Sequence, residues 1–100
     1  MNKEVKKIVN QIVKGYNPEK IILFGSHAND TSGKFSDVDL AIIKNTNKQT
    51  FFSRLKEVCS VIHSPLDTDL LVYTPKEWKF YADHYFIKEI INTGKIVYEK

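Results

Sequence analysis

Hydrophobic positions along the chain recur with two periods, and their alternation predicts the secondary structure. Near the N-terminus, apolar residues at intervals of three and four predict a helix that Asn2 caps and Gly15 ends. The apolar stripe of this helix consists of Val5, Ile8, Val9, Ile12 and Val13. A second stretch of helical spacing, residues 48–63, is closed by Pro65.

Short apolar runs predict four strands between and after these helices. The runs are residues 21–24, 38–43, 69–73 and 95–98. The first run is continuously apolar, which is typical of a strand covered on both faces. Residues 26–32 could add a short helix, followed by a loop around Gly33.

The last predicted helix has the clearest start signal in the chain. Thr74 can cap it, a proline follows at the first helical position, and Glu77 completes a capping box. Tyr73 and Trp78 occupy the two positions of a hydrophobic staple. The helix is expected to continue to Gly94.

The alternation of helices and strands predicts an α/β (α+β) fold with a mixed four-stranded sheet flanked by helices. One hundred residues give room for a single domain, 1–100, with one core. The alternation excludes all-β and helical-bundle folds. Hydrophobic residues at 42% and charged residues at 27% are ordinary for a globular protein.

The net charge of +3 comes largely from lysines on the polar side of the first helix. A solvated helix face explains them better than a nucleic-acid surface, so nucleic acid is not expected as a partner. No apolar run approaches the roughly 18 residues of a membrane span. The N-terminus lacks the apolar stretch of a secretion signal, and a cytoplasmic location with no membrane contact is expected.

Two apolar features of the predicted helices bear on burial and on possible partners. Cys59, the single cysteine, lies at an apolar helical position and is expected to be a buried core thiol. The last helix is apolar on nearly all sides, so it is either an aromatic core or an interface in a homodimer or hetero-oligomer. One stripe contains Trp78, Tyr81, Ala82, Tyr85 and Phe86, and the other contains Phe80, Ile87 and Ile91.

Acidic residues stand at the start of two predicted strands. Asp37 and Asp39 share one face because side chains alternate along a strand, and at about 6.6 Å they would repel by roughly 2.5 kcal/mol at a dielectric near 20. Asp69 opens the next strand, and Asp67 precedes it either as an orienting group or as an exposed loop carboxylate. If these strands are neighbours, their carboxylates meet at one edge of the sheet. Mg²⁺ prefers such oxygen ligands together with water and phosphate.

Gly25 and Ser26 could supply the complementary anion site. A glycine after a buried strand lets the backbone approach a ligand, and a helix beginning at Ser26 would favour an anion. His27 borders this site and could touch the ligand. A nucleoside triphosphate with Mg²⁺ would satisfy both the turn and the carboxylates.

The conjunction of these motifs resembles the signature of the DNA polymerase β-like nucleotidyltransferase superfamily. That signature is Gly-Ser, ten residues, then Asp-x-Asp, and it is read here from Gly25-Ser26 to Asp37-Val38-Asp39 with hydrophobic flanks on both sides. Asp69, in "DTDLLVYTPKEW", matches the third carboxylate of the family. One departure is Asp30, which stands where many relatives have glycine.

Within that superfamily, the chain is most similar to minimal nucleotidyltransferase (MNT) domains, the MntA-like antitoxins of HEPN/MNT pairs. The resemblance implies a magnesium-dependent enzyme that transfers AMP from ATP to an acceptor hydroxyl, such as a tyrosine of a HEPN toxin. Asp37, Asp39 and Asp69 would be the catalytic residues and would bind two Mg²⁺ ions, and Gly25 and Ser26 would bind the nucleotide. The alternative is a non-catalytic MNT-fold module that neutralises a HEPN partner by binding it.

Overall fold

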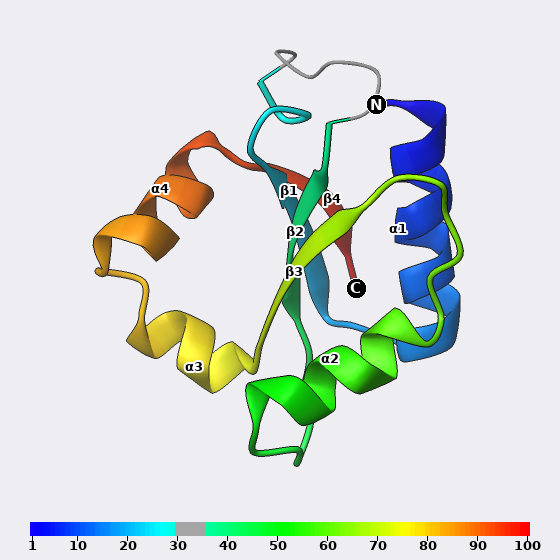
Figure 1. The fold of residues 1–100 in the computed structure, drawn as a ribbon. Coiled ribbons are helices and arrows are strands. Elements are labelled where there is room, and N and C mark those ends of the chain that lie inside the picture. Colours follow the sequence, from blue (N-terminus) through cyan, green and yellow to red (C-terminus); the bar gives the residue numbers. More distant parts are fainter. Residues whose placement is uncertain (30–35) are drawn as a thin grey trace.

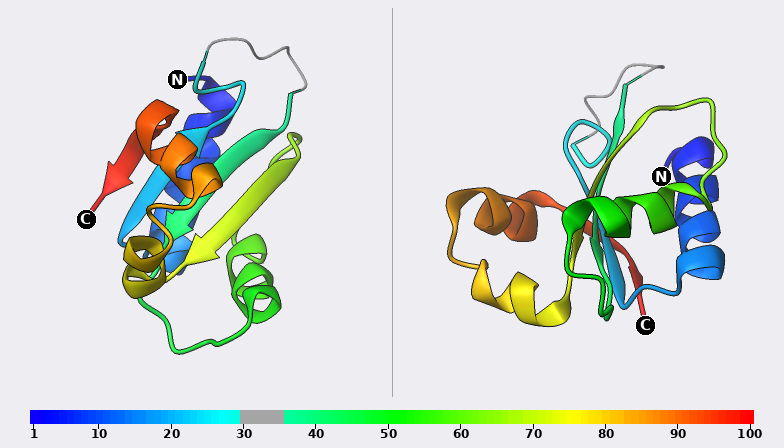
Figure 2. Two further views of the ribbon diagram at one scale, coloured as in Figure 1. Left: turned by 90° about the vertical axis from the view of Figure 1, so that its left-hand side faces the viewer. Right: turned by 60° about the horizontal axis from the view of Figure 1, so that its bottom comes forward.

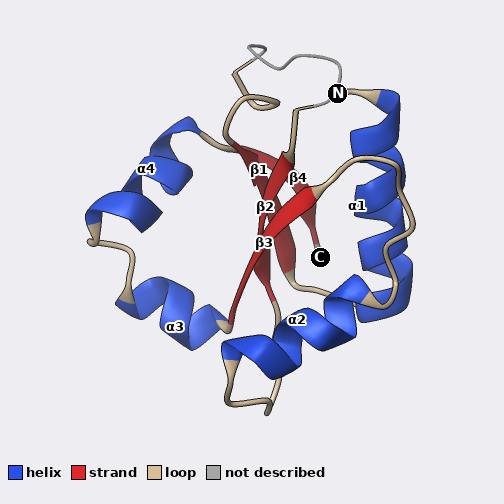
Figure 3. Ribbon diagram, in the orientation of Figure 1, coloured by secondary structure: helices blue, strands red, loops and turns tan. Residues whose placement is uncertain are grey.

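The computed structural model describes residues 1–29 and 36–100, which form a four-stranded sheet with helices on both faces (Figures 1 and 3). In chain order the elements are α1 (Lys3–Tyr16), β1 (Lys20–Phe24), β2 (Val38–Ile43), α2 (Phe51–Cys59), β3 (Thr68–Tyr73), α3 (Pro75–Phe80), α4 (Tyr85–Thr93) and β4 (Lys95–Glu99). The strand order is β3-β2-β1-β4. Among the strand pairs of the described residues, β2–β3 alone is parallel, so the predicted mixed sheet is confirmed.

The sheet separates two layers of helices. Helices α1 and α2 cover one face, and α3 and α4 cover the other (Figure 2). The larger core includes Val5, Ile8, Ile12, Ile21, Leu23, Leu40, Ile42, Val58, Leu70 and Val72, and the smaller core is formed by Ile22, Ala41, Ile87 and Ile90. Consecutive strand residues therefore enter opposite cores, as the twofold period of a strand requires.

Helix α1 begins where the sequence predicts and ends two residues later. The Asn2 side chain accepts a hydrogen bond from the Glu4 backbone N–H at 2.7 Å. The helix continues through Gly15 to Tyr16, and Asn17 ends it in the left-handed conformation, with φ at 54°. Asparagine tolerates that conformation, so it replaces the expected glycine as the terminating residue.

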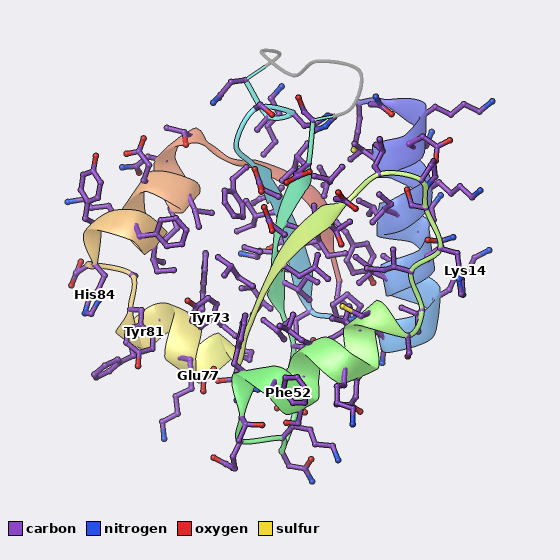
Figure 4. All side chains as sticks on the ribbon, in the orientation of Figure 1. Lys14, Phe52, Tyr73, Glu77, Tyr81 and His84 are labelled. Carbon is purple, nitrogen blue, oxygen red and sulfur yellow. The ribbon has the colours of Figure 1, made fainter. Side chains whose placement is uncertain are left out.

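The prediction of one long last helix is wrong, since the structure has two helices there, α3 and α4. The capping box of Thr74 and Glu77 is confirmed, as is the staple, since the Tyr73 and Trp78 rings lie 5.7 Å apart. Tyr81 then leaves the helical conformation and packs on Tyr73, with ring centroids 6.1 Å apart (Figure 4). This contact anchors the end of α3 to the sheet, and the chain turns before α4 begins after His84.

The break divides the predicted aromatic stripe between core and surface. Trp78 and Tyr81 pack against the smaller core, whereas Tyr85 is 83% exposed and Phe86 is 53% exposed. Cys59 is also exposed, so the expected core thiol is wrong. The reason is that α2 buries the face carrying Arg54 and Val58, and Cys59 lies beside that face.

Arg54 is a buried residue that the apolar pattern did not single out. Its guanidinium forms a two-pronged ion pair with Glu77, with Nη1–Oε1 at 2.7 Å and Nη2–Oε2 at 3.1 Å. It also donates to the carbonyls of Lys48 and Val72. These bonds join α2, β3 and α3 at one end of the sheet, and Asp39 and Asp69 lie at the other end. In the part of the chain that the structure describes, no helix has both the length and the apolar composition to cross a bilayer.

Candidate active site

The end of β1 and the beginnings of β2 and β3 meet at one edge of the sheet. In the ladder, Asp39 lies opposite Phe24 on one side and opposite Asp69 on the other. The neighbours Leu40 and Leu70 enter the larger core, so both aspartates point to the face that carries α3 and α4. The predicted meeting of carboxylates from two separate strands is therefore present for Asp39 and Asp69.

Gly25 connects β1 to this carboxylate pair. Its φ is +73°, and a Cβ built on it would overlap Oδ2 of Asp39. No other residue fits here without strain, for reasons of both space and backbone conformation. The motif glycine thus brings the backbone of the turn directly against the carboxylate of the second motif.

The sequence predicts a helix for residues 26–32. Over residues 26–29, which the structure describes, the chain forms a turn instead. The N–H groups of Ala28 and Asn29 donate to the Gly25 carbonyl at 3.1 and 3.3 Å, which forms a turn over residues 26–29. The remainder of that predicted helix, with Asp30 and Gly33, lies outside the described residues.

The pKa of Asp39 is affected by its burial and by the neighbouring carboxylates. The pKa of Asp39 is raised above its ordinary value, first by burial and then by the charge of Asp69 and a side-chain hydrogen bond to it. Asp37 raises this pKa further, and His27 opposes the shift. Protonation of Asp39 would relieve this repulsion, and a bound cation would relieve it without a proton.

Two pockets flank the carboxylates, and Asp69 borders both. One, of about 350 Å³, lies over the sheet and is walled by Phe24, Phe51, Leu70, Leu71 and Phe86, with Asp39 and Asp69 at its end. The other, of about 500 Å³, lies at the β3 edge and is lined by Asp37, Cys59, Ile62, Ser64, Leu66, Asp67, Thr68 and Asp69. Asp37 therefore stands beside the pair but opens to a different pocket from Asp39.

Sequence comparison identifies the family to which this arrangement belongs. Residues 6–100 match the family Polbeta, described as "Polymerase beta, Nucleotidyltransferase". The chain is a member of this nucleotidyltransferase family. No curated protein sequence matches the chain.

Solved structures share the fold of this nucleotidyltransferase at low sequence identity. A Sulfolobus solfataricus protein assigned as a nucleotidyltransferase is 20% identical with a TM-score of 0.69, over 98% of this chain and 79% of that one. A toxin–antitoxin structure with AMP-PNP is 20% identical with a TM-score of 0.66, over 99% of this chain and 75% of that one. A mutant MntA-HpeT toxin–antitoxin complex is 17% identical with a TM-score of 0.58, over 96% and 72% of the two chains.

The donor set of the nucleotidyltransferase site fits a divalent cation bound together with a phosphate. Among the described residues, no group of three His, Cys, Asp or Glu side chains is arranged to hold a metal ion. Asp39 and Asp69 nevertheless supply two hard oxygen ligands in mutual contact, with Asp37 nearby. Mg²⁺ commonly uses one or two carboxylates and takes its remaining ligands from water and substrate phosphate. Asp39 and Asp69 therefore suit a Mg²⁺ ion whose remaining ligands are water and the phosphate of a nucleotide.

His27 does not point freely into this site. Its side chain is only 9% exposed, and its Nε2 lies 3.0 Å from the carbonyl oxygen of Ser36. The sequence left open whether His27 touches the ligand, and in the structure its ring bonds to the Ser36 backbone carbonyl. The exposed Asp67 contributes through its backbone, because its carbonyl accepts a 2.9 Å hydrogen bond from the Val38 N–H.

Proposed function

We propose that this nucleotidyltransferase uses Mg²⁺ to transfer AMP from ATP to a hydroxyl of a partner protein, a tyrosine of a HEPN toxin. The observation that carries the proposal is the contact between the two sequence motifs. Gly25 packs where any Cβ would meet Asp39, and Asp39 in turn pairs with Asp69. A phosphate held by the turn would thus lie beside oxygen ligands for the cation that accompanies it.

Each residue has a role in the proposed reaction. Asp39 and Asp69, with Asp37, would hold Mg²⁺, which neutralises phosphate charge and lowers the pKa of the attacking hydroxyl. Ser26 and the backbone of its turn would bind the β- and γ-phosphates. The hydroxyl loses its proton to solvent and its oxygen bonds to the α-phosphorus, while the bond from that phosphorus to the bridging oxygen breaks and releases pyrophosphate. The chain's contribution is mainly the alignment of these groups.

A surface that could seat such a partner lies next to Asp39 and Asp69. We define the aromatic patch as the exposed large apolar side chains of α3 and α4, namely Phe80, Tyr85, Phe86 and Ile91. Phe86 belongs to this patch and also walls the 350 Å³ pocket, where its ring meets Phe24 edge-on at 6.1 Å. A protein seated on the patch could therefore reach Asp39 and Asp69 with a side-chain hydroxyl. The fold likeness to two toxin–antitoxin structures supports a toxin as that partner.

The transfer experiment uses ATP labelled in the α-phosphate, Mg²⁺ and the protein encoded beside this one. We expect label on the partner from the wild type and from Glu57→Ala, and none from Asp39→Ala. Glu57 is a suitable control because it is an exposed carboxylate on α2, which covers the opposite face of the sheet from α3 and α4. Absence of label from the wild type on any hydroxyl acceptor, with either Mg²⁺ or Mn²⁺, would refute the proposal.

A non-catalytic binding module is the second candidate. The observation in its favour is that the aromatic patch could dock a toxin whether or not transfer occurs. This reading expects the wild type and Asp39→Ala to inhibit the partner equally, with no label transferred. Loss of inhibition on Phe80→Ser together with Tyr85→Ser, two patch residues that do not wall the 350 Å³ pocket, would assign docking to the patch in either reading.

A further inference from the structure

We infer that His27 is a positioning residue that ties the Gly25–Ser26 turn to the segment carrying Asp37. The inference rests on the proposed function for its catalytic consequence, but its structural part can be tested separately. His27 lies directly after the turn, and Ser36 lies directly before Asp37. The 3.0 Å bond from the His27 Nε2 to the Ser36 carbonyl oxygen spans nine positions and joins the two motifs by a side chain.

The chemistry of this bond determines which atom carries the proton. A carbonyl oxygen can only accept, so Nε2 of His27 must be the protonated nitrogen and the donor. The bond is partly buried, and His27 is 9% exposed. Loss of the donor would remove this hydrogen bond from the Ser36 carbonyl and with it a directional link between the two segments.

Packing alone does not determine how the His27 ring is oriented. A cavity of about 150 Å³ borders the ring and is lined by Met1, Asn2, Val5, Leu23, Lys95 and Val97 as well. A ring with open space on one side can turn unless a directional bond holds it. The hydrogen bond to Ser36 therefore fixes the orientation of the His27 ring, which packing does not.

The bond matters more for Asp37 than for Asp39. Asp39 lies within β2, paired on one side with β1 and on the other with β3. Asp37 precedes the strand, is exposed, and has a neighbour on each side that is held: Val38 by the Asp67 carbonyl and Ser36 by His27. Removing the His27 bond should loosen Asp37 while the Asp39–Asp69 pair stays in place.

Hydrogen exchange on the protein without nucleotide or metal tests the structural part. We compare His27→Gln, whose amide nitrogen has a similar reach to Nε2 and can donate, with His27→Met, which has a similar length but no donor. We expect the Val38 amide to exchange about fivefold faster in His27→Met, the factor that corresponds to about 1 kcal/mol for one hydrogen bond. His27→Gln and the exposed-site control His63→Met should match the wild type. Equal exchange in all four proteins would overturn the inference.

Transfer kinetics test the catalytic consequence. We expect His27→Met to need a higher Mg²⁺ concentration for half-maximal rate and to have a lower kcat, with His27→Gln restoring both towards the wild type. A uniform loss that tracks the melting temperature, without rescue by glutamine, would show that His27 is merely structural and would also overturn the inference. An inactive wild type would refute the proposed function, and the exchange experiment would still decide whether the bond positions Asp37.

Discussion

Replacing Asp39 by asparagine should stabilise the folded protein in the absence of divalent cations, although it should abolish transfer. Asp39 and Asp69 lie opposite each other on parallel strands, which are about 5 Å apart. Two unit charges at that separation repel by about 3 kcal/mol at an effective dielectric of 20 and by about 0.8 kcal/mol at 80. Because Asp69 is exposed, we expect Asp39→Asn to gain an intermediate amount, about 1–2 kcal/mol in free energy of unfolding.

The pH dependence of this gain follows from the direction of the Asp39 pKa shift. Its pKa is raised in the folded protein, so the folded state binds more protons than the unfolded state between the ordinary value of 3.8 and the raised value. The wild-type penalty is therefore complete above the raised pKa and is relieved as the pH falls through it towards 3.8. The advantage of Asp39→Asn should shrink over the same window.

Urea unfolding measures the difference in free energy of unfolding between the wild type and Asp39→Asn. We carry it out at pH 7 and at pH 4, first with chelator and then with Mg²⁺ and a non-hydrolysable ATP analogue. We expect the ligands to stabilise the wild type and not Asp39→Asn, and the surface control Asp83→Asn to stay within about 0.5 kcal/mol of the wild type. If Asp39→Asn is no more stable than the wild type at pH 7 with chelator, the carboxylates do not repel as the geometry requires. The argument for a cation between them would then fail.

Three further substitutions test other contacts. Gly25→Ala should abolish transfer and lower the melting temperature, because its Cβ meets Asp39 and its φ is positive; unchanged activity would contradict the close approach of the two motifs. Arg54→Met should cost about 2 kcal/mol in denaturant unfolding, less than the roughly 3–5 kcal/mol of a fully buried pair because Glu77 is 37% exposed. The Arg54 hydrogen bond lowers the Glu77 pKa, so this pair should stabilise the protein above pH 4.5 and lose its effect as the pH falls through the lowered value; a pH-independent difference would count against it. Cys59→Ser should change stability by less than about 0.5 kcal/mol, and a larger loss would mean that the thiol is buried after all.

The arrangement of the site could be predicted where local spacing leaves little choice. Alternation along a strand puts Asp39 on the face opposite Leu40, and the same rule places Asp69 opposite Leu70. What alternation could not supply is that β2 and β3 are parallel neighbours in register, which brings the two aspartates side by side. That pairing depends on contacts between segments about 30 residues apart.

The errors have a common origin in tertiary contacts. Nothing in the local pattern distinguishes one long helix from α3 and α4, because the break depends on Tyr81 packing against Tyr73 in the sheet. Arg54 resembles an ordinary polar helix residue until Glu77 from another helix comes within 2.7 Å. Cys59 fits an apolar spacing, but the direction in which α2 lies on the sheet leaves it exposed.

The amino-acid sequence by itself determined the positions of the strands and the N-caps Asn2 and Thr74, because each depends on the conformational preferences of residues a few places apart. Only the tertiary structure decided which carboxylates meet, that Gly25 must lack a side chain beside Asp39, and that the His27 ring bonds to the Ser36 carbonyl. Those outcomes depend on how separate segments pack in three dimensions, and local preferences do not specify the relative placement of such segments.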